Sequence, residues 1–155
     1  MPCYLFTYHG HGTWMPDHRR GYVRRKGGVV TADQRMALCY RKNMKQKTVA
    51  FDGMLQKHLI EGIRTACQFL EVRCHGIATE RSHVHLLISW TSARTWQSIH
   101  QALKTSLTRR LNGQVRRQKW FSKGGSRKRI EDREHFEYLQ NVYLPGHSGL
   151  LWTES

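Results

Sequence analysis

Apolar side chains recur at every second position in the middle of this chain, at Val84, Leu86, Ile88 and Trp90. Side chains two residues apart on a β-strand share one face of the sheet. The alternation therefore predicts a strand over 83–90 whose apolar face is buried against helices. His83 and His85 occupy intervening positions, so both imidazoles would point away from that apolar face.

Helices are predicted where apolar residues recur every three or four positions. One such stripe begins near Asp52 and contains Leu55, Leu59, Ile63, Ala66 and Leu70. A second stripe contains Trp96, Ile99, Leu103, Leu107 and Leu111. We expect both helices to pack on the same core. Upstream, Thr31 and Gln34 form a capping-box pattern that predicts a helix as far as about residue 44.

Two further strands complete the predicted sheet. Residues 3–8 and 71–79 have the composition of strands, and the turn 80–82 would join the second of them to strand 83–90 as an antiparallel hairpin. The chain contains no internal repeat and no long linker. We therefore predict a single domain over 1–155 of the α+β class, with an antiparallel sheet and helices packed on one face.

The charge of the chain indicates its partner. Lys and Arg number 26 against 11 Asp and Glu, which gives a formal net charge of +15 and a pI near 10.3. Such an excess of positive charge favours a polyanion, and nucleic acid above all. An anionic membrane surface is the competing partner, but the sequence has no long apolar span and no signal-peptide core. The four cysteines form no C-x-x-C pair, so we expect reduced thiols in a cytoplasmic protein.

The histidine pair is a candidate metal site. Imidazoles two residues apart on a strand can supply two ligands to a divalent ion and leave positions open for water or a substrate oxygen. Glu80, three residues before His83, could add a carboxylate ligand. The alternative is a pair of half-buried histidines with no ligand. A second pair, His9 and His11, lies in a glycine-containing stretch and is more typical of a polar loop.

Basic side chains after the predicted strand 83–90 form a candidate DNA-binding surface. The helix that follows this strand and the segment beyond it carry cations suited to tracking a phosphate backbone. A solvated helix face is the alternative. The residues that we predict to contact DNA are Lys104, Arg109, Arg116, Arg117, Lys123 and Arg127. The loop 10–28, with its own basic run, is either a further phosphate-contacting arm or a solvated surface loop.

The last predicted helix spans 132–143 and carries a candidate nucleophile. Phe136, Leu139 and Tyr143 lie at i, i+3 and i+7 and would face the core, which gives Tyr143 a structural role. Tyr138 lies about 200° around the helix from Phe136 if every residue turns about 100°. Its phenol would therefore be exposed or in a cleft, where it could attack a phosphodiester. The alternative is an ordinary surface tyrosine.

Taken together, these segments resemble the HUH single-tyrosine transposases, which serve hairpin-ended bacterial insertion sequences and include REP-associated relatives. The resemblance rests on four segments that extend over nearly the whole chain. They are Tyr4-Leu5-Phe6-Thr7-Tyr8 running into Gly12-Thr13-Trp14-Met15-Pro16, Ser82-His83-Val84-His85-Leu86-Leu87-Ile88, Trp120-x-x-x-Gly124-Gly125-Ser126-Arg127, and Glu137-Tyr138-Leu139.

The resemblance implies a ferredoxin-like or RRM-like HUH endonuclease fold and a transposase that cleaves and rejoins single-stranded DNA at hairpin-bearing sites. His83 and His85 would bind Mg²⁺ or Mn²⁺, Glu80 would be an acidic ligand, and Tyr138 would form a 5′-phosphotyrosine intermediate. Members often carry Gln or Asn one turn after the tyrosine, where this chain has Val142. The third metal ligand therefore stays open.

Two further alternatives remain open at this point. The last helix packs in its own subunit or is exchanged in a homodimer. The protein is either an enzyme or a non-catalytic, RRM-like protein that binds single-stranded nucleic acid. In either case we expect it in the bacterial cytoplasm, associated with the nucleoid, and not in a membrane.

Overall fold

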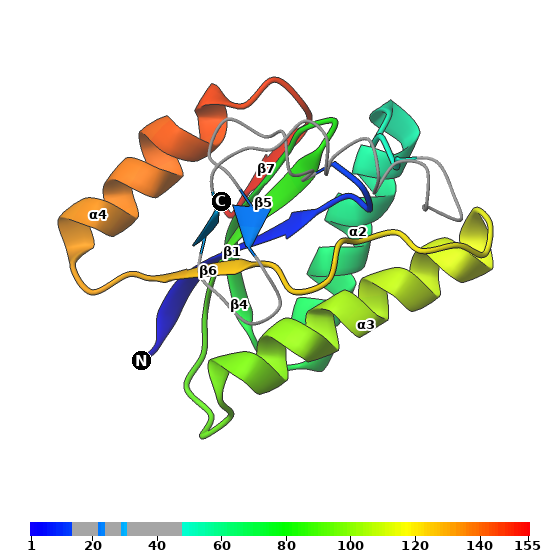
Figure 1. The fold of residues 1–155 in the computed structure, drawn as a ribbon. Coiled ribbons are helices and arrows are strands. Elements are labelled where there is room, and N and C mark those ends of the chain that lie inside the picture. The colour runs from blue at the N-terminus through cyan, green and yellow to red at the C-terminus, as the bar shows by residue number, and fades with distance from the viewer. Residues whose placement is uncertain (14–21, 24–28, 31–47) are drawn as a thin grey trace.

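The described part of the chain is built on a five-stranded antiparallel sheet with the strand order β6-β1-β5-β4-β7 (Figure 1). The computed structural model describes residues 1–13, 22–23, 29–30 and 48–155. The strands of this sheet are β1 (Cys3–His9), β4 (Arg73–Thr79), β5 (His83–Ser89), β6 (Ser126–Arg129) and β7 (Leu151–Thr153). A separate two-stranded ribbon pairs β2 (Tyr22–Val23) with β3 (Val29–Val30). The helix predicted from Thr31 and most of the predicted loop 10–28 lie outside the described residues.

The predicted hairpin is confirmed as β4 and β5. These strands pair antiparallel, and the backbone N–H of Glu80 donates a 2.8 Å hydrogen bond to the carbonyl of His83 across the turn. On the other side of β5, β1 pairs in a register that sets Thr7 opposite His85 and His9 opposite His83. The central strand thus has neighbours on both sides, and its own alternation fixes which side chains face which layer.

The two predicted amphipathic helices are α2 (Gly53–Phe69) and α3 (Trp96–Gln114). Each begins where a side chain caps the first turn. The Asp52 carboxylate accepts from the backbone N–H of Leu55 at 2.8 Å, and the Thr95 hydroxyl accepts from the backbone N–H of Ser98 at 3.2 Å. No helix in the described ranges has the length and apolar character needed to cross a membrane.

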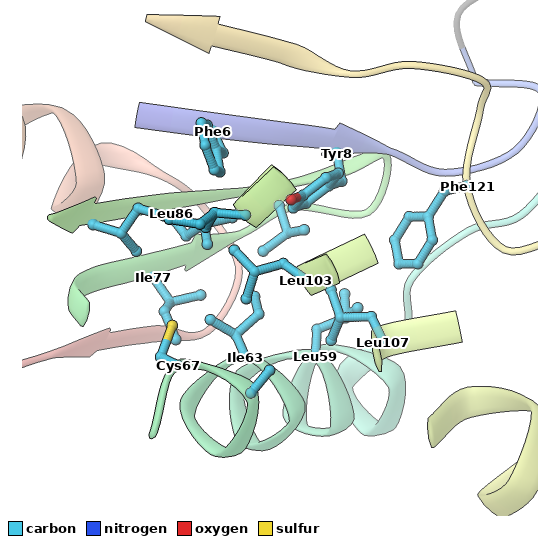
Figure 2. Packing of buried hydrophobic residues seen from close by; sticks show 14 of the residues in the cluster. Phe6, Tyr8, Leu59, Ile63, Cys67, Ile77, Leu86, Leu103, Leu107 and Phe121 are labelled. Atoms are coloured by element: carbon cyan, nitrogen blue, oxygen red, sulfur yellow. The ribbon is translucent and has the colours of Figure 1, made fainter. Parts of the chain in front are cut away.

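The main core lies between the sheet and these two helices (Figure 2). Val84, Leu86, Ile88 and Trp90 of the predicted strand are all buried in it. They meet apolar residues from both helices, among which Leu59, Ile63, Leu103 and Leu107 are completely buried. The period-2 pattern of the strand and the longer period of the helices therefore bury one shared apolar layer, as predicted.

A smaller core cluster covers the opposite face of the sheet. It contains Leu5, Ala78, Leu87, Ile130, Leu139 and Leu144. The chain reaches this face through α4 (Arg133–Tyr138), which continues into a π-helical turn, η1 (Leu139–Tyr143), and a 3-10 turn, η2 (Leu144–Gly146). The prediction that the helices pack on one face of the sheet holds for α2 and α3. The C-terminal helical segment lies on the other face (Figure 1).

Candidate metal centre and active site

His83 and His85 lie beside each other on β5, on the face opposite α2 and α3. Their ring centroids are 4.6 Å apart. His85 is buried and His83 half-buried. This is the orientation that the strand alternation predicts, because the alternating residues Val84, Leu86 and Ile88 point into the main core.

A third histidine completes the cluster. His147 follows the 3-10 turn η2, and one ring nitrogen from each of His83, His85 and His147 lies within 4.8 Å of the other two. Three imidazole donors at this spacing can hold a divalent metal ion. No second group of this kind occurs in the part of the chain that the structure describes.

Hydrogen bonds orient each of the three rings through its Nδ1 atom. The Nδ1 of His85 shares a 2.6 Å hydrogen bond with the Thr7 hydroxyl, and that of His83 shares a 2.8 Å bond with the Ser82 hydroxyl. The Nδ1 of His147 donates to the carbonyls of Tyr143 and Leu144, at 2.9 Å and 3.1 Å. Because a carbonyl only accepts, the proton of a neutral His147 sits on Nδ1 and its Nε2 keeps a lone pair. Such partners are typical of metal-binding histidines.

The surroundings keep the two strand histidines neutral. Burial, with smaller contributions from His83, His147 and His9, lowers the pKa of His85 to about 3. Burial also lowers the pKa of His83. Neutral imidazole is the form that binds a metal ion, so both rings are in the binding form at neutral pH.

Tyr143 lies against this cluster. Its hydroxyl oxygen is 3.5 Å from Nε2 of His85, and its ring centroid is 5.0 Å from that of His147. The side chain is half-buried and also packs against the smaller core cluster. Tyr143 therefore has the packing contact expected from its stripe and, in addition, presents its hydroxyl to the histidines.

Tyr138 has a different position. Its side chain is 52% exposed and makes no hydrogen bond or ring contact with the histidines of the cluster. Both predicted orientations are confirmed, because Tyr138 is exposed and Tyr143 packs with Phe136 and Leu139 on the smaller core cluster. Only the regular α-helix expected over 132–143 is wrong, since residues 139–143 form a π-helical turn. What the sequence did not show is that the face on which Tyr143 packs also carries the histidine cluster.

Glu80 contacts the segment that carries the third histidine. One carboxylate oxygen accepts from the backbone N–H of Ser148 at 2.9 Å, and the other accepts from the Ser148 hydroxyl at 2.6 Å. These hydrogen bonds are the main reason why the pKa of Glu80 is lowered, with smaller contributions from His147 and His83. Glu80 does not belong to the group of three clustered donors, so its structural contact differs from the predicted ligand role.

Five of the six cations predicted to contact DNA are exposed: Arg109, Arg116, Arg117, Lys123 and Arg127. The first is on α3, and the next two follow its C-terminal end. Lys123 precedes β6 and Arg127 lies within it, where its guanidinium stacks 4.0 Å from the centroid of the Trp96 ring. These side chains remain open to a polyanion.

Lys104 is occupied within the fold. Its ammonium donates to the carbonyls of Ser122 and Gly124, at 2.7 Å and 2.8 Å, and burial lowers its pKa. Lys104 therefore fastens the segment before β6 to α3. The sequence predicted Lys104 to contact a phosphate, whereas in the structure its ammonium binds two backbone carbonyls of its own chain.

The edge strand β6 brings positive charge to both faces of the sheet. Arg127 is paired with Phe6, and Lys128 with Leu5. Because Leu5 belongs to the smaller cluster and Phe6 to the main core, Lys128 lies on the histidine face and Arg127 on the helix face. The α3 surface and the histidine cluster are on opposite faces, and β6 is the basic element at the edge that joins them (Figure 1).

The sequence of this chain matches one known protein family. A family model described as "Transposase IS200 like" matches residues 36–126, which is more than half of the chain. The chain belongs to the IS200-like transposase family. The matched residues of this family member contain His83, His85 and the whole of α3, and end before Tyr143 and His147.

Two solved structures are similar to this IS200-like family member in fold. One is a REP-associated tyrosine transposase bound to a REP hairpin, with a TM-score of 0.50 and 10% identity over 90% of this chain and 62% of that chain. The other is a candidate transposase from Deinococcus radiodurans R1, with a TM-score of 0.53 and 13% identity over 92% of this chain and 88% of that chain. The chain thus spans less than two thirds of the first structure. No curated protein matches the chain in sequence.

The candidate metal ligand that sequence reasoning missed is His147. The third ligand was sought four residues after Tyr138, at Val142. The same helical spacing counted from Tyr143 leads to His147, and residues at i and i+4 are neighbours on a helix. The signal was therefore present in the sequence of this IS200-like family member, but it depended on which tyrosine faces the metal site.

Proposed function

We propose that this protein is a single-tyrosine DNA transposase that cleaves and rejoins single-stranded DNA, with Tyr143 as the nucleophile. The observation that carries the proposal is the 3.5 Å separation between the Tyr143 hydroxyl and a ring nitrogen of the three-histidine cluster. The other candidate, Tyr138, is exposed and lacks such a contact. Family membership supports the reaction class.

His83, His85 and His147 would hold the divalent metal ion. Their donor atoms are close enough together, and their Nδ1 hydrogen bonds leave the Nε2 atoms for the ion. Imidazole donors suit Mn²⁺ better than Mg²⁺, which prefers oxygen ligands. When bound, the ion would supply positive charge beside the scissile phosphate and stabilise the charge that develops during transfer.

The chain's own contribution to the reaction is the tyrosine oxygen. This oxygen forms a bond to phosphorus while the bond from phosphorus to the 3′ oxygen breaks. The phenol gives up its proton, and the 3′ oxygen gains one. The products are a 5′-phosphotyrosine and a free 3′-hydroxyl, and the retained ester allows a later rejoining without a nucleotide cofactor.

The exposed cations would guide the DNA to the site. Lys128 lies on the histidine face of the edge strand β6, and exposed Arg127 and Lys123 continue the charge along the same segment. A single strand that follows β6 would pass from the α3 side of the sheet toward Tyr143. The REP hairpin bound by the similar transposase supports hairpin-bearing DNA as the substrate.

One subunit contains all the residues of the proposed site. The C-terminal helical segment packs on its own sheet, so His147 and Tyr143 reach the β5 histidines without exchange of a helix between subunits. We therefore propose a site that a monomer can complete.

The decisive experiment is the detection of a covalent adduct. The protein is incubated with hairpin-bearing single-stranded DNA labelled on the 3′ side of the cleavage site, with Mn²⁺ or Mg²⁺, and run on a denaturing gel. We expect a labelled protein band that resists heat and detergent, and that is lost with a chelator. Absence of the band with both ions, while DNA binding persists, would instead indicate the non-catalytic binding protein.

A further inference from the structure

We infer that Glu80 is a positioning residue that holds His147 in the metal cluster through Ser148. The inference rests on the proposed function, because it concerns the same metal centre. It assigns to Glu80 the role of aligning two of the three histidines instead of binding the ion itself.

The contacts of Glu80 link the two parts of the chain that supply the ligands. Its backbone N–H donates to the carbonyl of His83 at 2.8 Å, so the residue is fixed to the hairpin that carries the first histidine. Its carboxylate accepts both the backbone N–H and the hydroxyl of Ser148, at 2.9 Å and 2.6 Å. Ser148 directly follows His147, and the carboxylate thereby ties the third histidine to the first.

The segment after His147 is held closely at its other end too. The backbone N–H of Gly149 donates to the carbonyl of Thr79 at 3.0 Å, and that of Leu150 donates to the Gln56 side chain at 3.0 Å. A Cβ on Gly149 would overlap the Thr79 carbonyl oxygen, so the backbone needs glycine here. The Glu80–Ser148 contact is therefore the first in a series of bonds that align this segment with the end of β4.

The His147 ring is thus oriented from two directions. On the helical side its Nδ1 donates to the carbonyls of Tyr143 and Leu144. On the strand side, the main chain immediately after it is bound to Glu80. Loss of the Glu80 carboxylate removes the second restraint, and the third ligand then has to be ordered when the ion binds. Partners of this outer kind typically change metal affinity by about 10- to 100-fold.

The test is a double-mutant cycle on Mn²⁺ affinity, measured by EPR titration of the full chain without DNA. The four proteins are wild type, Glu80→Ala, His147→Ala and the double variant. We expect Glu80→Ala to weaken Mn²⁺ binding about tenfold in the wild-type background. In the His147→Ala background the same change should weaken binding less than about twofold, because the residue through which Glu80 acts is gone. An equal loss in both backgrounds would overturn the inference and make Glu80 a direct ligand.

Two further variants keep the test decisive if Glu80→Ala does not fold. Ser148→Ala removes the hydroxyl that donates to Glu80 and leaves every metal-ligand candidate in place, so we expect a several-fold loss of Mn²⁺ affinity that also disappears in the His147→Ala background. Unchanged affinity in Ser148→Ala would overturn the positioning role. Glu61→Ala is the matched loss of one carboxylate, because Glu61 pairs with Arg110 on the helix side of the sheet, and it should leave Mn²⁺ affinity unchanged.

Failure of the proposed function would give a different result from failure of this inference. If wild type does not bind Mn²⁺, the metal centre itself is refuted, and the positioning role falls with it. If wild type binds Mn²⁺ and the effects in the cycle are additive, only the positioning role is refuted. Melting curves of each variant show whether a loss of binding reflects a loss of the fold.

Discussion

The hydroxyl oxygen of Tyr143 lies 3.5 Å from Nε2 of His85, a residue 58 positions earlier in the chain. His85 is on the central strand, whereas Tyr143 ends the π-helical turn that follows α4. The contact brings the phenol oxygen of Tyr143, the proposed nucleophile, to a nitrogen that can bind a metal ion. It also makes Tyr143 and Tyr138 experimentally distinguishable.

The first prediction concerns these two tyrosines. Tyr143→Phe should abolish the covalent DNA adduct, because it deletes the oxygen that would attack phosphorus. The variant should still bind DNA and lose no more than about 1 kcal/mol of stability, since its ring keeps the packing contacts. Tyr138→Phe is the matched control, and we expect it to form the adduct in normal amounts. An adduct in Tyr143→Phe but not in Tyr138→Phe would reassign the nucleophile to Tyr138.

The second prediction concerns the three histidines. His83→Ala, His85→Ala and His147→Ala should each abolish cleavage and weaken Mn²⁺ binding, because each removes one donor from the cluster. Melting temperatures should stay within about 5 °C of wild type, since the main core lies on the other side of the sheet. His135→Ala, on α4 and outside the cluster, should cleave normally. Full activity in His147→Ala would restrict the metal site to the β5 pair.

The third prediction concerns the exposed cations. Replacing Arg109, Arg116, Arg117 and Lys123 by Ala should weaken binding to every single strand, whatever its sequence. The slope of log affinity against log salt concentration should flatten by roughly 0.7 for each phosphate that the variant no longer neutralises. Fluorescence anisotropy at several salt concentrations measures both effects. An unchanged slope would place the DNA elsewhere on the protein.

Lys104→Ala provides a contrast within the same set. Because its ammonium is bonded to two backbone carbonyls, its loss should lower the melting temperature and loosen the segment before β6. We expect a smaller change in the salt slope for this variant than for replacement of any exposed cation. A large slope change at unaltered stability would return Lys104 to the DNA-contacting group.

The fourth prediction concerns the two glycines before β6 and near the end of α3. Gly125 has φ +141°, and a Cβ there would lie 2.9 Å from both the His100 ring and the Thr7 carbonyl oxygen. Gly125→Ala should therefore destabilise the fold by about 2 kcal/mol or more. Gly113→Ala has open space near the end of α3 and should be neutral or stabilise by up to about 1 kcal/mol. Urea denaturation of both variants measures the difference.

The fifth prediction concerns the dependence of stability on pH. Burial lowers the pKa of His100 to about 4, with Lys104 and Arg127 contributing, whereas an unfolded histidine titrates near about 6.5. Between these two pKa values His100 is protonated in the unfolded chain but neutral in the folded one. The free energy of unfolding should therefore fall as pH decreases from about 6.5 toward about 4. Above about 6.5 this residue should have no effect.

His100→Leu tests this origin of the acid sensitivity. The Nε2 atom of His100 is buried and has no hydrogen-bond partner among the described residues, so the change removes a titrating group without breaking a bond. Urea denaturation at pH 7 and pH 5 should show a smaller pH effect in the variant than in wild type. A remainder of at least similar size is expected, because burial lowers the pKa of His85 further, to about 3, and also lowers the pKa of His83. An identical pH effect in both proteins would contradict the prediction.

Local patterns determined most of the fold. Alternation identified β5 and the direction of its histidines, apolar spacing identified α2 and α3, and a short turn identified the β4–β5 hairpin. These features depend on the period of a strand or helix, which each segment carries in its own sequence. The net charge, likewise, needed no structure.

The site required the tertiary structure. His147 joins the β5 histidines only because the smaller core cluster holds the C-terminal segment on that face of the sheet. Tyr143 meets the histidines because its apolar stripe packs on the sheet face that carries them. Ser148 lies 68 residues after Glu80, so no local pattern indicated that these two residues are partners. A sequence period fixes where a side chain points relative to its own segment. Only packing between distant segments decides what that side chain meets.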